Sequence, residues 1–381
     1  MSDQVPDGPD RMPAVQLVLL RVASHGLPTS LPTQSPLTPA QWQLLLQEAS
    51  RHRLLGLLVA AAASGNVALT DDQAADLRRI ASVITAHSMQ LQALLLTTVA
   101  ALADRDVSPV VLKGFAAATL DYADPTWRQF GDLDLLVRPE EFDRAVAAMI
   151  ALGYGRRGRP ERRPGYDSRY AKDVTFLVPN GSSIDIHRTL VSGPLAERVD
   201  LRDCWAQQRC FELNGVSFRA LSDTTRFLSL CFHAALGDHP IRLLSARDVC
   251  QGLVNPALDP QDVLERAGSW NCEVVVARAV TASSSALPVQ LNTPLIDWAA
   301  KFRARPRDEA LLDMYTGLQP PGPRRDWATV REMRGARRRL GFIAGAVFPS
   351  RYYLEGRYSG YVDYWRQQLS SLRQPSDVPP T

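Results

Sequence analysis

Apolar residues recur every three or four positions over most of the chain, which is the spacing of amphipathic helices. This repeat runs from about residue 14 to residue 104 and returns after about residue 190. Between the two stretches the spacing changes to short apolar runs separated by turns, which is typical of β-strands. The pattern therefore predicts two helical regions on either side of a smaller segment that contains a sheet.

The central segment alternates predicted strands and helices. We expect strands over 108–112, 132–137, 172–179 and 182–190, and helices over 115–122 and 139–154. Asn180-Gly181 joins the last two strands and is the dipeptide that best fits a tight hairpin turn. This order predicts an α+β fold, in which a small mixed sheet is flanked by N- and C-terminal helical regions.

The changes of pattern divide the chain into five parts. They are a disordered tail (1–12), an N-terminal helical region (13–104), an α/β core (105–190), a helical region that completes a cleft (191–318) and a basic, aromatic extension with its tail (319–381). The proline-rich sequence QPPGPRRD opens the last part and is typical of a linker.

Composition narrows the class of protein. Hydrophobic residues make up 45% of the chain and charged residues 22%, as in ordinary folded proteins. A net charge of +3 does not predict bulk binding to nucleic acid or to a membrane. The five cysteines are widely spaced without a C-x-x-C pair, which favours a reducing compartment. No apolar run reaches the about 18 residues of a membrane span, and we expect a cytoplasmic protein.

Asp132 and Asp134 stand two residues apart on a predicted strand. Alternate residues of a strand point to the same face, so both carboxylates project together while Leu133 and Leu135 face the core. Two such charges repel, and they fit either a solvated edge or a divalent cation. Asp-x-Asp is common by chance, so this pair alone favours the solvated edge.

A third carboxylate on a neighbouring strand favours the cation. Asp185 lies in SSIDIH, whose alternation places Asp185 and His187 on one face. Three carboxylates on adjacent strands are what a two-metal phosphoryl-transfer site requires. His187 fits a group behind the metal ligands, a base on the acceptor side, or a purely structural residue.

Positive groups precede these carboxylates. Lys113-Gly114 lies where a strand turns into a helix, so backbone N–H groups and a helix N-terminus can face a phosphate there. Only three of the 43 basic residues are lysines, which gives Lys113 added weight. Arg128 lies four residues before Asp132 and is expected to reach the outer phosphates of a nucleotide. The alternative for Arg128 is a structural role.

The segment LKGFAAATLDYADPTWRQFGDLDLLVRPEEFDRAVAAMIALGY, followed by SIDIH, is similar to a known pattern. It resembles a poorly characterised bacterial nucleotidyltransferase family, which belongs to the DNA polymerase β-like nucleotidyltransferase superfamily. The motif-bearing match covers about residues 108–190, and weaker similarity extends toward about residue 290. The ordered combination is specific, although no single piece of it is.

The resemblance implies a Mg²⁺-dependent transfer of a nucleoside monophosphate from a nucleoside triphosphate to an acceptor, with release of pyrophosphate. It implies Asp132, Asp134 and Asp185 as catalytic metal ligands. We expect two Mg²⁺ ions, for which Mn²⁺ can substitute, and ATP as the donor. Together with the reasoning above, it assigns nucleotide binding to Lys113, Gly114, Arg128, His187 and Arg242.

The chain departs from the superfamily pattern at the phosphate turn. Phe115 follows Gly114 where the superfamily usually has serine or glycine, and a longer stretch, 115–131, separates the turn from Asp132. We therefore expect a cationic phosphate grip, in which Lys113 and Arg128 replace the serine hydroxyl.

Three further groups are weaker candidates. The arginine-rich loop 156–170 fits either a phosphate or acceptor contact or a solvated loop. The arginines of 331–339, followed by several tyrosines, fit an RNA-contacting surface, although a helix face with snorkelling arginines is favoured. The spacing of His233, Asp238 and His239 does not place them on one helix face, so a helix end or a solvated loop is favoured over a metal site.

The sequence leaves the acceptor open. An RNA end, a protein or peptide side chain and a small molecule all fit, and the near-neutral charge argues against long nucleic acid. We expect the C-terminal helical half to bind the acceptor in a cleft that faces the Asp185 hairpin. Along that cleft we expect His187, His233, Arg242 and Arg247. The alternative is that the N-terminal helices close over the site.

Two rival functions stay open. One is nucleotidyl or phosphate addition to a natural-product peptide, and the other is a degenerate copy that binds nucleotide as a sensor or scaffold. The missing serine after Gly114 supports the degenerate copy, whereas three mutually repelling carboxylates count against it. We expect Asp134→Asn to abolish turnover, to leave the fold intact and to raise the stability of the metal-free protein.

Overall fold

The computed structural model describes residues 11–32, 35–237, 240–316 and 322–373. Four helices precede the sheet: α1 (Arg11–Ala23), α2 (Pro39–Arg51), α3 (Leu55–Ala63) and α4 (Asp71–Ala103). Thr38 and Thr70 begin α2 and α4 with capping boxes, in which each threonine and a glutamine three residues later satisfy one another's backbone N–H groups. Arg53 has a positive φ of 58° and separates α2 from α3.

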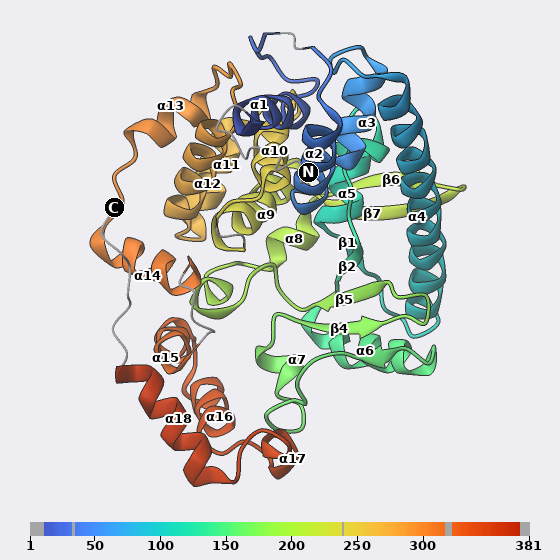
Figure 1. Ribbon diagram of the computed structural model, residues 1–381. Helices are drawn as coiled ribbons and strands as arrows, with labels where there is room; N and C mark the ends of the chain where they lie inside the picture. Colours follow the sequence, from blue (N-terminus) through green and yellow to red (C-terminus); the bar gives the residue numbers. More distant parts are fainter. Residues whose placement is uncertain (1–10, 33–34, 238–239, 317–321, 374–381) are drawn as a thin grey trace, which may run out of the picture.

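Seven strands form one mixed sheet in the order β3-β4-β5-β2-β1-β7-β6 (Figure 1). The strands are β1 (Val110–Val111), β2 (Asp132–Leu136), β3 (Gly155–Arg156), β4 (Asp173–Leu177), β5 (Ser183–His187), β6 (Gln208–Leu213) and β7 (Val216–Leu221). β2 runs parallel to β5 and antiparallel to β1, and β1 runs parallel to β7. The predicted α+β fold, a mixed sheet flanked by helical regions, is confirmed.

The hairpin of β6 and β7 lies after residue 190, where the pattern predicted only helices. Asn214 and Gly215 form its turn, with φ of 51° and 77°. They are the same dipeptide that predicted the β4–β5 hairpin, so the signal was present in the sequence. Val111 of β1 pairs with Ala220 of β7 and joins this hairpin to the sheet. The sheet therefore extends beyond residues 105–190.

The two faces of the sheet have different coverings. On one face, α4 and α6 (Phe142–Ala151) pack against Leu133, Leu135 and Ile184 in one apolar core. On the other face, Leu136 belongs to a second core with the helices of the C-terminal half. Asp132 and Asp134 precede Leu136 on that second face, because alternate strand residues share a face.

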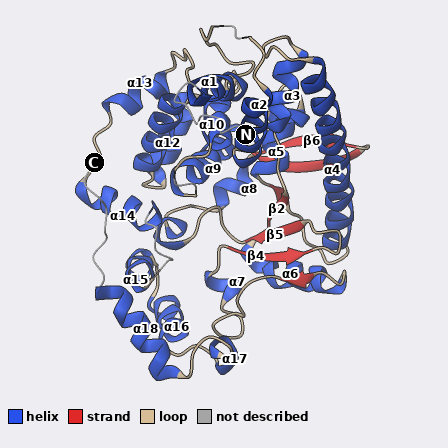
Figure 2. Cartoon of the chain, in the orientation of Figure 1, coloured by secondary structure: helices blue, strands red, loops and turns tan. Residues whose placement is uncertain are grey.

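Most of the remaining regular secondary structure of the described chain is helical, and loops join the helices (Figure 2). α5 (Lys113–Leu120) follows β1 and α7 (Asp167–Tyr170) precedes β4. After β5 come α8 (Arg202–Ala206), α9 (Asp223–Leu236), α10 (Leu243–Leu253), α11 (Pro260–Ser269), α12 (Glu273–Ala286), α13 (Pro294–Lys301), α14 (Pro306–Thr316), α15 (Pro323–Glu332), α16 (Ala336–Val347), α17 (Arg351–Leu354) and α18 (Tyr361–Arg373).

The arginine-rich loop joins the core to the C-terminal helices, which lie beside α7 in Figure 1. Tyr166 packs with Val330 and Phe342 in a small apolar core. Arg162 pairs with Asp326 of α15 at 3.0 Å. These contacts give the loop a structural role in docking α15 and α16 against the sheet region.

Of the helices that the structure describes, α4 is the one whose length and apolar content would suffice to cross a membrane. Leu91, Leu94, Leu95 and Leu102 of α4 are buried against the sheet. Part of this apolar content therefore serves the core, as in other helices that cover a sheet.

Candidate active site

β2 and β5 place two carboxylates side by side. Asp134 pairs in register with Asp185 across these parallel strands, so both side chains leave the same face of the sheet. Ligand atoms of Asp134, Asp185 and His187 all lie within 4.8 Å of one another. The structure thus brings together two of the three carboxylates predicted as metal ligands, and it adds His187 to them.

Asp132 lies on the same face but one pair further along the strand. It pairs with Ser183 instead of Asp185 and is half-buried. It does not belong to the group of ligand atoms around Asp134, although its negative charge helps to raise the pKa of Lys113. Its role as a metal ligand stays a prediction.

Asp134 holds two positively polarised groups on one oxygen. Lys113 Nζ lies 3.1 Å from Asp134 Oδ1, and His187 Nε2 lies 2.7 Å from the same atom. Burial would raise the pKa of Asp134, but Lys113 and the hydrogen bond with His187 hold this pKa far below its usual value. Burial alone would lower the pKa of Lys113. The negative charges of nearby carboxylates, that of Asp134 above all, raise it instead. Both groups are therefore charged at neutral pH.

Asp185 is less well matched than Asp134. Burial raises its pKa, and a hydrogen bond with Thr175 offsets only part of that effect. Its Oδ1 atom is buried and has no hydrogen-bond partner. A carboxylate oxygen left in this state next to a second carboxylate is a suitable ligand atom for a divalent cation, which prefers oxygen donors.

His187 is buried between two carboxylates. Its Nδ1 atom lies 3.7 Å from Asp173 Oδ2, on the side opposite Asp134. Lys172 Nζ lies 2.9 Å from the same Asp173 oxygen. The hydrogen bond between Nε2 and Asp134 orients the imidazole. At 3.7 Å Asp173 is too far for a hydrogen bond, and Nδ1 is buried without a hydrogen-bond partner.

Gly114 lies in the first turn of α5, where Leu112 provides no side-chain cap. A Cβ at Gly114 would come within 3.2 Å of the Phe130 side chain, so the close packing of the turn favours glycine. The Gly114 carbonyl accepts a hydrogen bond from Arg128 Nη1 at 3.1 Å.

Arg128 is buried, and its guanidinium is held by the protein. Nε and Nη2 donate to the two oxygens of Asp248 in α10 at 2.8 and 2.6 Å. Tyr122 donates to the same carboxylate at 2.7 Å. Arg128 therefore links the segment before β2 to the C-terminal half. It pairs with Asp248, not with the Asp124 of its own loop, and its contact with a nucleotide stays a prediction.

The C-terminal half borders a cleft of about 140 Å³, which Lys113 also lines. Lys172, Ser192, His233 and Arg325 also line it. His233 thus lies where the acceptor cleft was expected. The cleft is bordered by residues of the sheet region, of α9 and of the C-terminal extension.

Other residues expected in this region lie elsewhere. Arg247 is 1% exposed and its guanidinium lies over the Tyr122 ring, so the expectation that it lines the cleft is wrong. Arg242 is the half-buried residue that precedes α10 and does not line the cleft, so its nucleotide contact stays a prediction. Asp238 and His239 lie outside the described residues.

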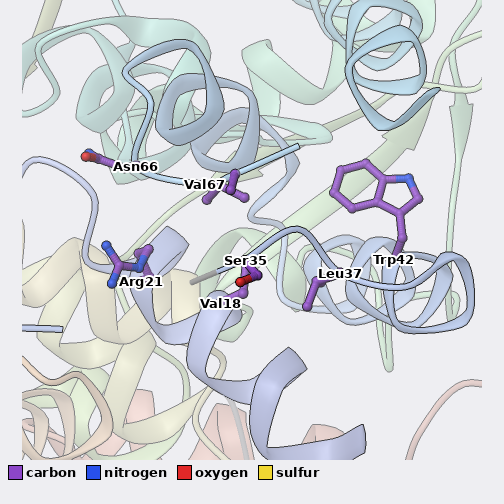
Figure 3. A pocket seen from close by; sticks show the side chains of 8 residues that line it. Val18, Arg21, Ser35, Leu37, Trp42, Asn66 and Val67 are labelled. Carbon is purple, nitrogen blue, oxygen red and sulfur yellow. The ribbon is translucent and has the colours of Figure 1, made fainter. Parts of the chain in front are cut away.

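Two further cavities lack comparable chemistry. One lies among the N-terminal helices, where Val18, Arg21 and Trp42 line a space of about 10 Å³, room for one water (Figure 3). The other is an apolar groove of about 580 Å³ between α15, α16 and α18, with Asp326 as its one charged lining residue among those the structure describes. Neither contains the paired carboxylates.

Sequence reasoning missed three residues of this region. Lys172 carried the same signal as Lys113, because it is another of the three lysines in the chain. Arg325 and Tyr315 carried none, since one arginine among many and a tyrosine in a helix are unremarkable in sequence. They reach the cleft only because the C-terminal helices pack back toward the sheet region in the folded protein.

Comparison with known proteins adds the family. The model of a family described as uncharacterised nucleotidyltransferase matches residues 38–287, well over half of the chain and the whole of the sheet. No curated protein matches.

Two solved structures are similar to parts of the chain. The antibiotic-resistance factor ANT(2'')-Ia is 14% identical, with a TM-score of 0.27 over 52% of this chain and 91% of that one. An antigenic nucleotidyltransferase-like protein from Paracoccidioides brasiliensis is 14% identical, with a TM-score of 0.31 over 54% of this chain and 95% of the other.

Proposed function

Because the chain belongs to the uncharacterised nucleotidyltransferase family and is a nucleotidyltransferase, we propose that it transfers a nucleoside monophosphate from a nucleoside triphosphate to an acceptor and releases pyrophosphate. The observation that carries this proposal is the in-register pair of Asp134 and Asp185 with its buried, unpartnered oxygen. We take ATP as the donor and divalent metal as the cofactor.

The residues present fit a divalent cation. Asp134 and Asp185 offer oxygen ligands, and His187 lies close enough to join them or to orient Asp134. Asp132 is proposed as a further ligand from the same face. Bound Mg²⁺ would neutralise charge on the reacting phosphate and lower the pKa of the attacking hydroxyl.

The chain's own residues supply position and charge. Lys113 lies at the first turn of α5 and lines the cleft, where its ammonium can hold a phosphate oxygen. The hydrogen bond with His187 and the ion pair with Lys113 hold the Asp134 carboxylate in one orientation. We propose that Asp185, the carboxylate whose pKa burial raises, accepts the hydroxyl proton.

The reaction then balances. The acceptor oxygen forms a bond to the α-phosphorus, the bond between that phosphorus and the bridging oxygen to the β-phosphorus breaks, and pyrophosphate leaves. The proton of the acceptor hydroxyl passes to Asp185 and from there to solvent. Such a reaction depends mainly on positioning and on charge neutralisation.

The acceptor is proposed to enter from the C-terminal half, since that half borders the cleft. RNA ends, proteins or peptides and small molecules all remain candidates, and the net charge of +3 argues against long nucleic acid. We also propose a cytoplasmic location, which the five free cysteines favour.

The test uses ATP labelled either at the α- or at the γ-phosphate, with cell extract as acceptor source and Mg²⁺ or EDTA. Nucleotidyl transfer predicts α-label in the acceptor and γ-label only in pyrophosphate. Phosphate transfer instead predicts γ-label in the acceptor and α-label only in ADP. Nuclease, protease or filtration of the extract then assigns the acceptor class. Asp143 is an exposed carboxylate on α6, and Asp143→Asn is the matched control for Asp134→Asn. Absence of α-label transfer with every donor nucleotide would support a binding protein without turnover.

A further inference from the structure

The cleft beside the carboxylates is small and cationic. Lys113, Lys172 and Arg325 line its volume of about 140 Å³, and no carboxylate is among the described residues that do so. Pockets for whole drug-sized ligands are larger, roughly 300–1,000 Å³. The cleft therefore fits one compact anionic group instead of a whole nucleotide.

The two lysines connect this cleft to the carboxylate site. Lys113 pairs with Asp134 at 3.1 Å, and Lys172 pairs with Asp173 at 2.9 Å. Two of the three lysines of the chain thus lie at the same place. An anion in the cleft would lie next to the site of the proposed reaction and would share these ammonium groups with the carboxylates.

Arg325 of α15 reaches the cleft because its side chain is held in place. It donates a hydrogen bond to Ser192 Oγ, and its guanidinium lies 4.3 Å from the centre of the Tyr315 ring. The Tyr315 hydroxyl donates to the Ser192 carbonyl at 2.6 Å and accepts from the Leu195 N–H at 3.1 Å. Three parts of the chain therefore converge on one guanidinium.

Gly193 makes room for this guanidinium. A Cβ at Gly193 would lie 2.5 Å from Arg325 Nε and 3.0 Å from the Tyr315 hydroxyl, and the residue has a positive φ of 73°. Both the space and the backbone conformation require glycine. The position of Arg325 is thus built into the fold and is not that of a surface arginine with free rotation.

We infer that this cleft binds the β- and γ-phosphates of the donor, the part that leaves as pyrophosphate, and that Arg325 is a binding residue for them. The inference rests on the proposed function. Two phosphates carry several negative charges, which the three cations can match with charge-assisted hydrogen bonds. Arg128, the cation expected for this task from the sequence, pairs instead with Asp248, so the arginine comes from the other end of the chain.

The inference also gives the C-terminal extension a function. Arg325 and Tyr315 lie beyond residue 287, where the family match ends. The extension would therefore supply part of the donor site and would close one wall of it. Removal of the Arg325 side chain should then change phosphate affinity, which a purely structural extension would not predict.

The test measures binding of inorganic pyrophosphate to the full chain by calorimetry, with and without Mg²⁺, and the KM for ATP. Arg325→Ala should weaken pyrophosphate binding and raise the ATP KM about 10- to 100-fold, as expected for loss of a charge-assisted contact. Arg325→Lys should recover part of the affinity. Arg331→Ala, an exposed arginine on the same helix, should behave as the wild type.

Other outcomes would overturn the inference or separate it from the proposed function. Unchanged pyrophosphate affinity in Arg325→Ala would overturn it, as would a variant that raises only the KM for the acceptor, because the cleft would then hold an anionic acceptor. Should Arg325→Ala fail to fold, Ser192→Ala removes one anchor and should weaken pyrophosphate binding about 3-fold or more, as expected for loss of one hydrogen bond. If the two single variants Ser192→Ala and Arg325→Lys both fold and both bind pyrophosphate as tightly as the wild type, the inference is likewise refuted. Loss of turnover in Asp134→Asn with normal pyrophosphate binding in Arg325→Ala would refute this inference alone.

Discussion

Asp134 and Asp248 are both buried aspartates, 3% and 2% exposed, and each lies against a cation from another element. Their surroundings differ. Asp248 receives two hydrogen bonds from Arg128 and one from Tyr122, so both of its oxygens have partners. Asp134 lies instead beside a second carboxylate, Asp185, which keeps a buried oxygen without any partner.

The difference separates a structural cluster from a binding site. In the Asp248 cluster the positive and negative groups match, so the fold itself compensates for their burial. In the Asp134 cluster the carboxylates bring more negative charge and more acceptor atoms than nearby cations and donors can match. The pKa of Asp185 is raised because this carboxylate is buried there. A bound cation would remove this mismatch. In the Asp248 cluster the charges are already matched, so a bound ion would not stabilise it further.

The largest effect should come from Asp134→Asn. We expect turnover of α-labelled nucleotide to fall at least about 1,000-fold, roughly 4 kcal/mol in barrier, because a central carboxylate of the site loses its charge. Single-turnover transfer compared with Asp143→Asn measures this. Wild-type turnover in Asp134→Asn would mean that the Asp134 cluster is not the site of the reaction.

Asp134→Asn should also lower the stability of the metal-free protein. Repulsion between carboxylates led to the opposite expectation from the sequence alone. In the structure, Lys113 and His187 compensate the Asp134 charge, and the substitution leaves both without that partner. Urea unfolding in EDTA decides between the two expectations.

Arg128→Met should cost about 3–5 kcal/mol in the free energy of unfolding, because it leaves the buried Asp248 carboxylate without its cation. The double variant Arg128→Met/Asp248→Leu should recover most of that loss, since it removes both charges. Urea unfolding of the three proteins tests this. A double variant no more stable than Arg128→Met would show that the pair does not act as a matched unit.

Tyr122→Phe should cost about 1–1.5 kcal/mol. It removes one hydrogen bond to Asp248 but leaves both bonds from Arg128, so the carboxylate keeps its charge partner. The same unfolding experiment measures the change. A loss as large as that of Arg128→Met would mean that the hydroxyl, not the guanidinium, compensates Asp248.

Asp185→Asn should have the smallest effect and the opposite sign. Because burial raises the pKa of Asp185, replacement by a neutral group should slightly stabilise the metal-free protein. Mg²⁺ should raise the melting temperature of the wild type but not of this variant. Equal destabilisation by Asp185→Asn and Asp134→Asn would contradict the unequal matching of the two carboxylates.

The sequence determined the local elements because they depend on nearby residues. Apolar spacing predicted the helices before and after the core, and Asn180-Gly181 predicted the β4–β5 hairpin. The alternation of β2 and β5 placed Asp134 and Asp185 on the faces of their strands opposite the neighbouring apolar residues. The β6–β7 hairpin was missed although Asn214-Gly215 marked it, because the helical spacing that follows it dominated the interpretation of this part of the chain.

Tertiary structure decided which distant groups meet. Strand alternation fixes a face, but only the parallel register of β2 and β5 puts Asp134 opposite Asp185. Arg128 and Asp248 are 120 positions apart, and Arg325 and Ser192 are 133 apart, so no local pattern predicts either pair. The sequence could thus identify the residue types that the chemistry needs. Which arginine holds the fold and which one lines the cleft depends on chain packing, because arginine offers the same hydrogen-bond donors in both places.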